Sequence, residues 1–76
     1  MDRALILLTL ESDAGSEVLK EIRKTDGIIE TYYLYGPFDA YVIIEAVDST
    51  DLQNIVIDNI RQIDGIRSTM TCFVAE

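Results

Sequence analysis

Residues 22–35 read IRKTDGIIETYYLY and residues 60–73 read IRQIDGIRSTMTCF, so the second stretch repeats the first at an offset of 38 positions. Six residues are identical at that offset: Ile22/Ile60, Arg23/Arg61, Asp26/Asp64, Gly27/Gly65, Ile28/Ile66 and Thr31/Thr69. The offset is half of the 76-residue chain. Because a fixed internal period indicates repeated supersecondary units, the sequence predicts two similar halves within one small domain.

The first half is predicted to form a strand, a helix and a second strand. Residues 3–11 and 28–35 are rich in apolar, β-branched or aromatic residues, which is typical of strands. For the helix between them, Ser12 and Asp13 are N-cap candidates, and Gly27 is the candidate C′ glycine. The apolar stripe of this helix consists of Val18, Leu19 and Ile22.

The second half repeats this order after a turn at Gly36 and Pro37. Strands are predicted over residues 38–47 and 66–75, and the helix between them should begin at the acidic caps of residues 48–51. Gly65 is expected to end this helix. Its apolar positions follow the i, i+3, i+4, i+7 spacing, with Asn59 as the polar exception: Leu52, Ile55, Val56, Ile60 and Ile63.

The order βαββαβ predicts an α+β fold, a ferredoxin-like sandwich with two helices on one face of a four-stranded antiparallel sheet. Both alternating sets of the first strand are apolar: Ala4, Ile6, Leu8 and Leu10 on one side, and Leu5 and Leu7 on the other. A sheet face in water should instead carry polar residues. A second copy covering that face, as in dimeric α/β barrels, is the simplest explanation; a monomeric, Ile-rich domain is the alternative.

The composition argues against several classes of function. The 14 acidic and 6 basic residues give a net charge of −8, which disfavours binding to nucleic acid. Among the few basic residues, Arg23 and Arg61 are interpreted as charges at the ends of the two predicted helices. With no His and one Cys, we expect no catalytic residue, no metal site and no cofactor, and therefore no enzyme. The apolar run at residues 4–8 is too short to cross a bilayer, so we expect a cytoplasmic protein without membrane contact.

Two motifs in order resemble the effector-binding domain of the Lrp/AsnC (feast/famine) regulators, which is called RAM, for regulation of amino-acid metabolism. They are a Gly-x-x-Asp turn at residues 36–39 and a Gly-hydrophobic-x-x-Thr-x-Thr ending at residues 65–71. Gly15 after Ala14 also matches a glycine before the first helix of that domain. The resemblance covers residues 1–76 as one domain. Because the sequence starts at the first strand, it is similar to stand-alone RAM proteins, and we expect no helix-turn-helix domain.

The resemblance implies a sensor that acts in transcriptional regulation of amino-acid metabolism without binding DNA itself. Family members form dimers through facing sheets, and the dimers assemble into octamers or decamers. A small molecule, usually an amino acid, binds between dimers and alters the assembly. Co-assembly with full-length Lrp/AsnC regulators is also implied.

The ligand-binding candidates are Gly36, Pro37, Phe38, Asp39, Tyr41, Ile55, Thr69 and Thr71. In this hypothesis the loop N–H groups bind a carboxylate and Asp39 accepts from an ammonium group. Thr69 and Thr71 share a strand face, and Ile55 would favour an apolar ligand side chain. The structural alternatives are an ordinary hairpin turn, threonines that favour a strand, a tyrosine that packs the sheet, and a core isoleucine.

Three other functions stay open from the residues. The first is an ACT-like regulatory subunit of a metabolic enzyme, which would share the order of elements. The second is a small dimeric α+β barrel enzyme such as a monooxygenase, although several of these use His. The third is an assembly unit that binds no ligand.

Overall fold

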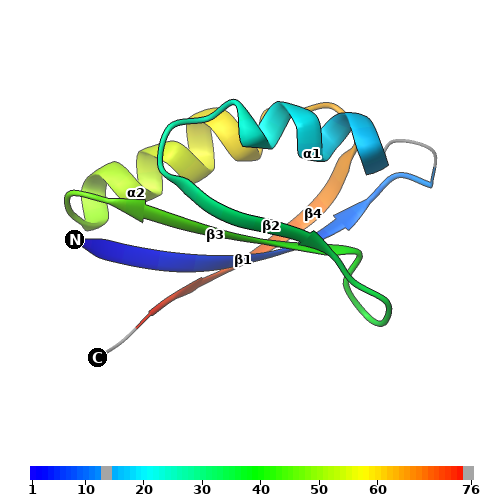
Figure 1. The fold of residues 1–76 in the computed structure, drawn as a ribbon, viewed down its shortest axis with the longest axis horizontal. Coiled ribbons are helices and arrows are strands. Elements are labelled where there is room, and N and C mark those ends of the chain that lie inside the picture. Colours follow the sequence, from blue (N-terminus) through cyan, green and yellow to red (C-terminus); the bar gives the residue numbers. More distant parts are fainter. Residues whose placement is uncertain (13–14, 75–76) are drawn as a thin grey trace.

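Both helices lie against one face of a four-stranded antiparallel sheet, as predicted, in a computed structural model that describes residues 1–12 and 15–74 (Figure 1). The elements in chain order are β1 (Asp2–Leu10), α1 (Gly15–Arg23), β2 (Ile28–Tyr33), β3 (Ala40–Ala46), α2 (Ser49–Ile55), the π-helical turn η1 (Val56–Ile60) and β4 (Ile66–Phe73). The order βαββαβ of the sequence analysis is therefore confirmed.

The strand order β2-β3-β1-β4 puts the first strand of each half in the centre of the sheet and the last strand of each half at an edge. Leu8 of β1 lies opposite Ala40 of β3 on one side and opposite Thr69 of β4 on the other. This register fixes which residues of the edge strand β4 face the helices. They are the residues opposite the buried positions of β1.

The core lies between the sheet and the helices. Alternate residues of β1 and β3 and the inner faces of the helices are buried: Ala4, Ile6, Leu8, Leu10, Val18, Leu19, Ile22, Ala40, Val42, Ile44, Ala46, Leu52, Val56 and Ile60. Full burial of a large aliphatic side chain contributes about 1.5–3 kcal/mol, so this layer is the main source of stability. On the helical side, this core consists of the apolar stripes that the sequence predicts, apart from Ile55 and Ile63, which are only partly buried.

The helix ends differ from the prediction. α1 ends at Arg23, four residues before Gly27, and the second helix ends at Ile60, five residues before Gly65. Neither glycine is therefore the C′ residue of its helix. Both have positive φ, 96° for Gly27 and 98° for Gly65, in the turns that lead into β2 and β4.

The start of the second helix agrees with the prediction, but its second part does not. Asp48 is the N-cap, and its Oδ1 accepts from Asp51 N at 2.9 Å. From Val56 the helix continues as a π turn, in which Arg61 N donates to Val56 O at 2.9 Å. The first helix begins at Gly15, and the predicted cap Asp13 lies outside the described residues.

Three of the strands are slightly shorter than predicted, whereas β1 keeps the predicted length but begins at Asp2 instead of Arg3. The predicted strand over 38–47 is observed over 40–46, and the one over 28–35 ends at Tyr33. β4 ends at Phe73, with Ala75 outside the described residues. Pro37 and its neighbours thus form a longer loop between β2 and β3, which extends beyond the sheet (Figure 1).

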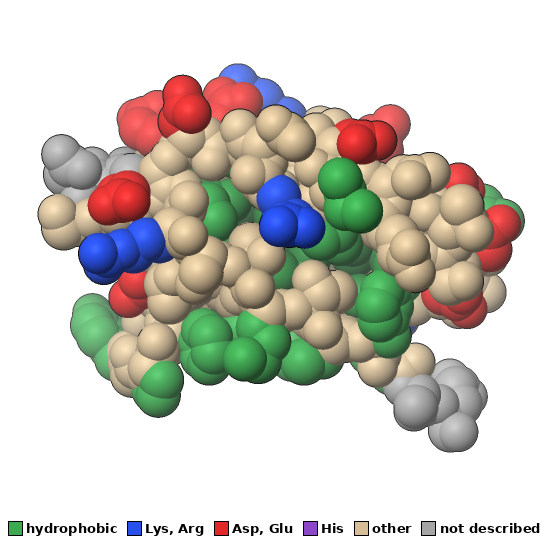
Figure 2. All heavy atoms as spheres, turned by 180° about the vertical axis from the view of Figure 1, so that it is seen from behind, with side chains coloured by type: hydrophobic (Ala, Val, Ile, Leu, Met, Phe, Trp, Pro, Cys, Tyr) green, Lys and Arg blue, Asp and Glu red, His purple; other side chains and the backbone are tan. Residues whose placement is uncertain are grey.

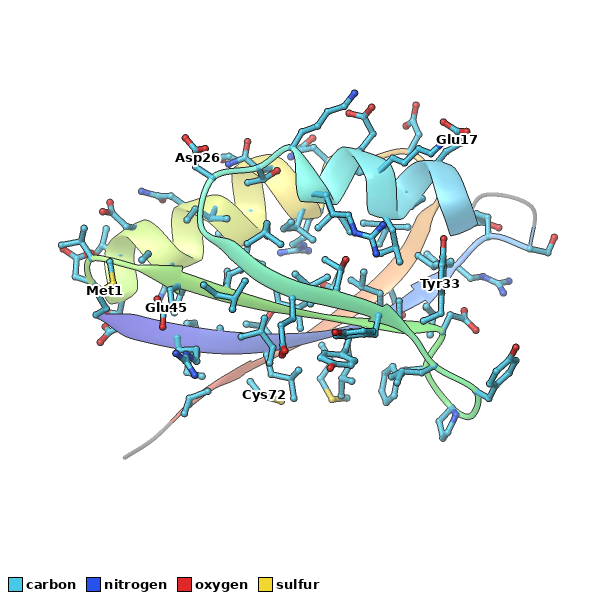
Figure 3. The ribbon with its side chains drawn as sticks, viewed as in Figure 1. Met1, Glu17, Asp26, Tyr33, Glu45 and Cys72 are labelled. Carbon is cyan, nitrogen blue, oxygen red and sulfur yellow. The ribbon has the colours of Figure 1, made fainter. Side chains whose placement is uncertain are left out.

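The second face of the sheet has no layer of helix over it (Figure 1). Cys72 points away from the helices on this side (Figure 3). Seen from behind, most of the visible acidic side chains lie over the helical layer, whereas apolar side chains line the opposite margin (Figure 2). The register assigns to this open face the partly or largely exposed residues Leu5, Leu7, Tyr32, Tyr41, Ile43, Met70 and Cys72.

Candidate functional site

A groove of about 350 Å³ runs between the second helix and the edge strand β4. We call it the β4 groove; it is lined by Gln53, Val56, Ile57, Arg61, Thr69, Thr71 and Phe73. Its volume lies at the lower end of the range for small-molecule sites. Seen from behind, the molecule is hollowed between its two layers, with apolar and basic side chains beside the hollow (Figure 2).

The threonines reach this groove because of the strand register. Thr69 lies opposite Leu8 and Thr71 opposite Ile6, and both partners are buried under the helices. Since opposed residues of neighbouring strands point to the same face, both threonines lie on the helical side of the sheet. They stay partly exposed because β4 is the outermost strand.

The π turn shapes the other wall of the groove. Ile57 is 46% exposed, although Leu19, its equivalent at the offset of 38, is 1% exposed. Val56 and Ile60, at the two ends of the turn, are buried like their equivalents Val18 and Ile22, so the halves differ in burial at Ile57. π turns inside α-helices are frequent at functional sites.

The groove carries a positive charge. Arg61 is a cation at its rim, and Gln53, Thr69 and Thr71 supply neutral polar groups. Among the described residues that line it, none is Asp or Glu. Its apolar walls come from Val56, Ile57 and Phe73. This combination suits a small anionic ligand that has an apolar part.

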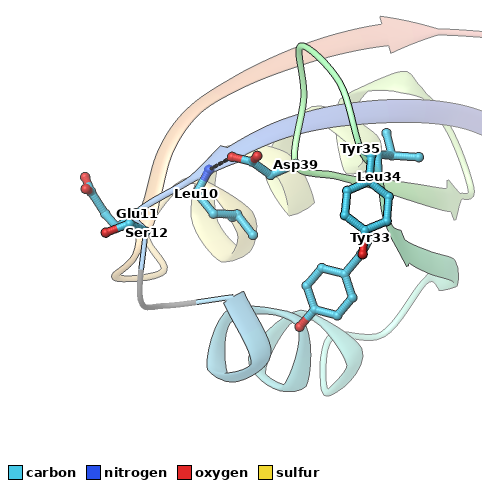
Figure 4. Close-up of a pocket in the computed structure, with 7 residues that line it drawn as sticks. All are labelled: Leu10, Glu11, Ser12, Tyr33, Leu34, Tyr35 and Asp39. Carbon is cyan, nitrogen blue, oxygen red and sulfur yellow. Dashed lines mark hydrogen bonds between the residues drawn. The ribbon is translucent and has the colours of Figure 1, made fainter.

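The predicted residue Asp39 lines a different cavity, of about 390 Å³, at the loop between β2 and β3 (Figure 4). Its Oδ2 accepts from Leu10 N at 2.8 Å, its N–H donates to Leu8 O at 2.8 Å, and its carbonyl accepts from Leu34 N at 2.8 Å. Asp39 therefore ties the loop to β1 and to the chain after β2. The cavity is completed by Glu11, Ser12, Tyr33 and Tyr35.

The other predicted residues lie elsewhere. Gly36 and Pro37 are exposed in the loop, and Phe38 is partly buried. Tyr41 is on the open face, where its ring stacks on Tyr32 with centroids 5.5 Å apart. Partial desolvation, followed by the charges of Glu30 and Tyr32, raises the pKa of Tyr41.

Ile55 packs against the core and lines two other cavities, beside Asp26 and Asn59, but it does not line the β4 groove. Within one copy of the described chain, Thr69 and Thr71 thus share a cavity, but neither shares one with Asp39. Sequence reasoning missed Arg61 and Gln53. The available signal for Arg61 was its repeat with Arg23, which we had interpreted as a pair of helix-end charges.

The described residues contain no group of three or more His, Cys, Asp or Glu side chains placed to hold a metal ion. Cys72 is exposed and unpaired within that part of the chain. Within the same residues, no helix combines the length and the apolar character that crossing a membrane requires.

Comparison with known proteins gives a family. The model of the Lrp/AsnC ligand binding domain matches residues 3–76. An HTH-type transcriptional regulator of Pyrococcus furiosus, described as uncharacterised, is 30% identical over 71 residues, which are 90% of this chain and 47% of the relative. The chain thus spans about half the length of that relative. A homocitrate synthase of Sulfolobus acidocaldarius is 30% identical over 76 residues, which are 96% of this chain and 16% of the enzyme.

Solved structures share the fold. The crystal structure of FFRP-DM1 has a TM-score of 0.94 and 27% identity, over 99% of this chain and 100% of that one. AsnC of Escherichia coli has a TM-score of 0.91 and 26% identity, over 99% of this chain and 51% of that one. A regulator of Neisseria meningitidis solved with L-Met has a TM-score of 0.89 and 19% identity, over 99% of this chain and 50% of that one. The chain belongs to the family of Lrp/AsnC ligand-binding domains, which occur in transcriptional regulators.

Proposed function

We propose that this domain senses a free amino acid, which binds in the β4 groove. The loop that carries Asp39 in a neighbouring copy would complete this binding site. The separation of the two candidate regions carries this proposal. β1 lies between β3, which follows Asp39, and β4, and the loop cavity shares no lining residue with the groove. A ligand that uses both Asp39 and Thr69 therefore needs two protomers.

The open sheet face supports association into a dimer. It displays half-exposed Tyr32 and Met70 beside partly buried aliphatic residues of β1 and β3. A contiguous apolar face on a small domain is typical of an interaction surface. Facing sheets would bury it in a twofold dimer, and the β4 grooves at the rims would remain free to meet neighbouring dimers in an octamer or decamer.

The ligand would act by shifting the equilibrium between assembly states. A ligand that bridges two dimers binds the higher oligomer more tightly than the dimer, and this difference in affinity sets the shift. The domain would thereby regulate transcription of amino-acid metabolism in the cytoplasm, without contacting DNA itself and through co-assembly with full-length Lrp/AsnC regulators. The bound L-Met of the Neisseria regulator supports an amino acid as the ligand class.

A thermal-shift screen against the common amino acids at millimolar concentration tests this function. Binding to the folded state stabilises it by RT ln(1 + [L]/Kd), about 2.7 kcal/mol at a hundredfold excess over Kd. The proposal expects a higher Tm with one chemical group of amino acids and a change in oligomer size by light scattering. If no amino acid raises Tm or changes the size, the sensor function is wrong.

Two substitutions separate the roles of Asp39. Asp39→Asn keeps an oxygen that accepts from Leu10 N but removes the charge that would face a ligand ammonium group. We expect it to retain stability and to lose affinity. Asp39→Ala should lose both, because Leu10 N is left without its acceptor. Unchanged affinity in Asp39→Asn would remove Asp39 from the ligand site.

The match to homocitrate synthase favours a second candidate, a regulatory domain that acts on a metabolic enzyme. The ligand site would be the same, but the partner would be a catalytic chain rather than a transcriptional regulator. Pull-down with the purified domain, with and without the stabilising amino acid, distinguishes the two. Recovery of a biosynthetic enzyme instead of an Lrp/AsnC regulator would support the second candidate.

A further inference from the structure

The internal repeat provides a comparison for the β4 groove. In the first half, Arg23 Nε donates to Thr31 Oγ1 at 2.6 Å, and Arg23 Nη2 donates to Thr31 O at 3.4 Å. Thr31 is buried beneath this contact. The arginine at the end of the helix thus donates directly to the strand threonine, and the two residues line a cavity of about 380 Å³ in which their polar groups already partner each other.

The second half has the same two residues at the equivalent positions, but the contact is open. Arg61 and Thr69 both line the β4 groove, and in the described part of the chain no hydrogen bond joins them. The backbone of Arg61 is held by its bond to Val56 O at the end of the π turn. The first half therefore shows the bond that these residue types form, and the second half presents both groups unconnected across a groove.

Building on the proposed function, we propose that Arg61 is the carboxylate-binding residue of the groove, and that the ligand carboxylate bridges Arg61 and Thr69. A planar guanidinium group can donate two parallel hydrogen bonds to a carboxylate, and the Thr69 hydroxyl can donate a third. The ligand oxygen atoms would replace the direct contact that Arg23 makes with Thr31. Val56, Ile57 and Phe73 would contact the carbon skeleton.

The electrostatics agree with this assignment. The chain carries a net charge of −8, so most of its surface repels an anion, whereas the described lining of the groove combines a cation with no carboxylate. The bound carboxylate can have two sources. It is either the α-carboxylate of any amino acid or the side-chain carboxylate of an acidic one, with the α-amino group at Asp39 of the neighbouring copy.

Isothermal titration of the full chain with L-leucine, L-glutamine, L-glutamate and glutarate tests the assignment. Arg61→Gln should weaken binding of every probe that binds by about 10- to 100-fold, because a charge-assisted contact is lost. Arg67→Gln is the matched control, since it removes the same charge from β4 at an exposed position outside the groove. Arg61→Lys, which keeps the charge but not the planar fork, should lie between the wild type and Arg61→Gln.

Each result has a distinct meaning. Loss of affinity in Arg61→Gln but not in Arg67→Gln supports the assignment. In that case, binding limited to L-glutamate and glutarate identifies the side-chain carboxylate, and binding of all three amino acids without glutarate identifies the α-carboxylate. If Arg61→Gln keeps its fold and binds as the wild type does, the assignment is wrong while the sensor function stands. If no probe binds the wild type and the amino-acid screen also fails, both are wrong.

Discussion

The two halves of the chain place the same pair of residues in different surroundings. Arg23 and Thr31 line a cavity of about 380 Å³ and are hydrogen-bonded to each other at 2.6 Å, whereas Arg61 and Thr69 line the β4 groove with no such bond among the described residues. The helices differ in the same way, since α1 is regular and the second helix changes to a π turn at Val56. One half uses the repeated unit to stabilise the fold, and the other keeps its polar groups available.

The second helix lines the groove through residues of its π turn. Ile57 in this turn is exposed where Leu19 is buried, whereas Ile60 and its equivalent Ile22 are both buried. At the end of the turn, Arg61 lines the groove and, within the described part of the chain, makes no bond such as the one that Arg23 donates to Thr31. The two halves thus differ at one apolar position of the helix and at the arginine contact.

The largest expected effect on stability tests the difference in burial between Leu19 of α1 and Ile57 of the second helix. Leu19→Ala should destabilise the protein by about 3 kcal/mol, because it empties a fully packed position. Ile57→Ala removes a half-exposed side chain and should cost under about 1 kcal/mol. Urea unfolding at one protein concentration measures both, since self-association shifts apparent stability. Equal losses in the two variants would contradict the asymmetry.

A smaller effect is expected at the turn that the halves have in common. Gly27 has φ 96°, and an added Cβ would lie 2.7 Å from the backbone oxygen of Glu45. Gly27→Ala should therefore cost about 2 kcal/mol in unfolding free energy. Gly36→Ala is the control for the strain of a positive φ, because Gly36 has φ 142° and its added Cβ would meet no atom within 4 Å. If Gly27→Ala costs no more than Gly36→Ala, the close approach to Glu45 is not a constraint.

The same substitution at the two equivalent threonines, Thr31 and Thr69, tests the difference between the halves. Thr31→Val removes the acceptor of Arg23 and should lower stability by about 1 kcal/mol. Thr69→Val should leave stability nearly unchanged but weaken binding of the amino acid found in the screen. Chemical unfolding gives the unfolding free energy of each variant, and titration with the amino acid gives the Kd of each. Reversed roles, with Thr69→Val the destabilised variant, would refute the division of functions.

The smallest effect concerns the open face, which both halves share. The pKa of Tyr41 is raised, so the unfolded chain loses this proton at a lower pH than the folded chain does. Stability from this group is complete below the ordinary tyrosine pKa of about 10 and is lost as pH rises through the folded-state value. When the pH is raised from neutral to above the folded-state pKa of Tyr41, the Tyr41→Phe variant should lose less stability than the wild type. Identical pH profiles would show that Tyr41 does not contribute.

Much of the fold could be predicted because the repeat and the apolar spacing are local features of the sequence. The unexpected features depend on contacts between distant residues. No residue type within Val56–Ile60 marks a π turn, and Gly27 and Gly65 match the pattern of helix ends although they lie in later turns. The apolar character of the open sheet face could be predicted from Leu5 and Leu7 of β1, because both alternating sets of residues in that strand are apolar.

The candidate site was less predictable for the same physical reason. Thr69 and Thr71 could be placed on one face from the strand period alone. That Asp39 holds Leu10 N could not be predicted, because the bond joins residues 29 positions apart. Arg61 looks equivalent to Arg23 in sequence, and the sequence does not show that Arg23 bonds to Thr31 while Arg61 and Thr69 line the β4 groove unbonded to each other.

The most direct test of this division is an amide NMR titration of the wild-type protein with the amino acid that raises Tm most in the screen. We expect shifts at Arg61, Thr69 and Thr71 and in the loop of residues 36–39, with Arg23 and Thr31 unchanged. Shifts at Arg23 and Thr31, with the β4 groove unaffected, would show that the ligand binds in the first half instead.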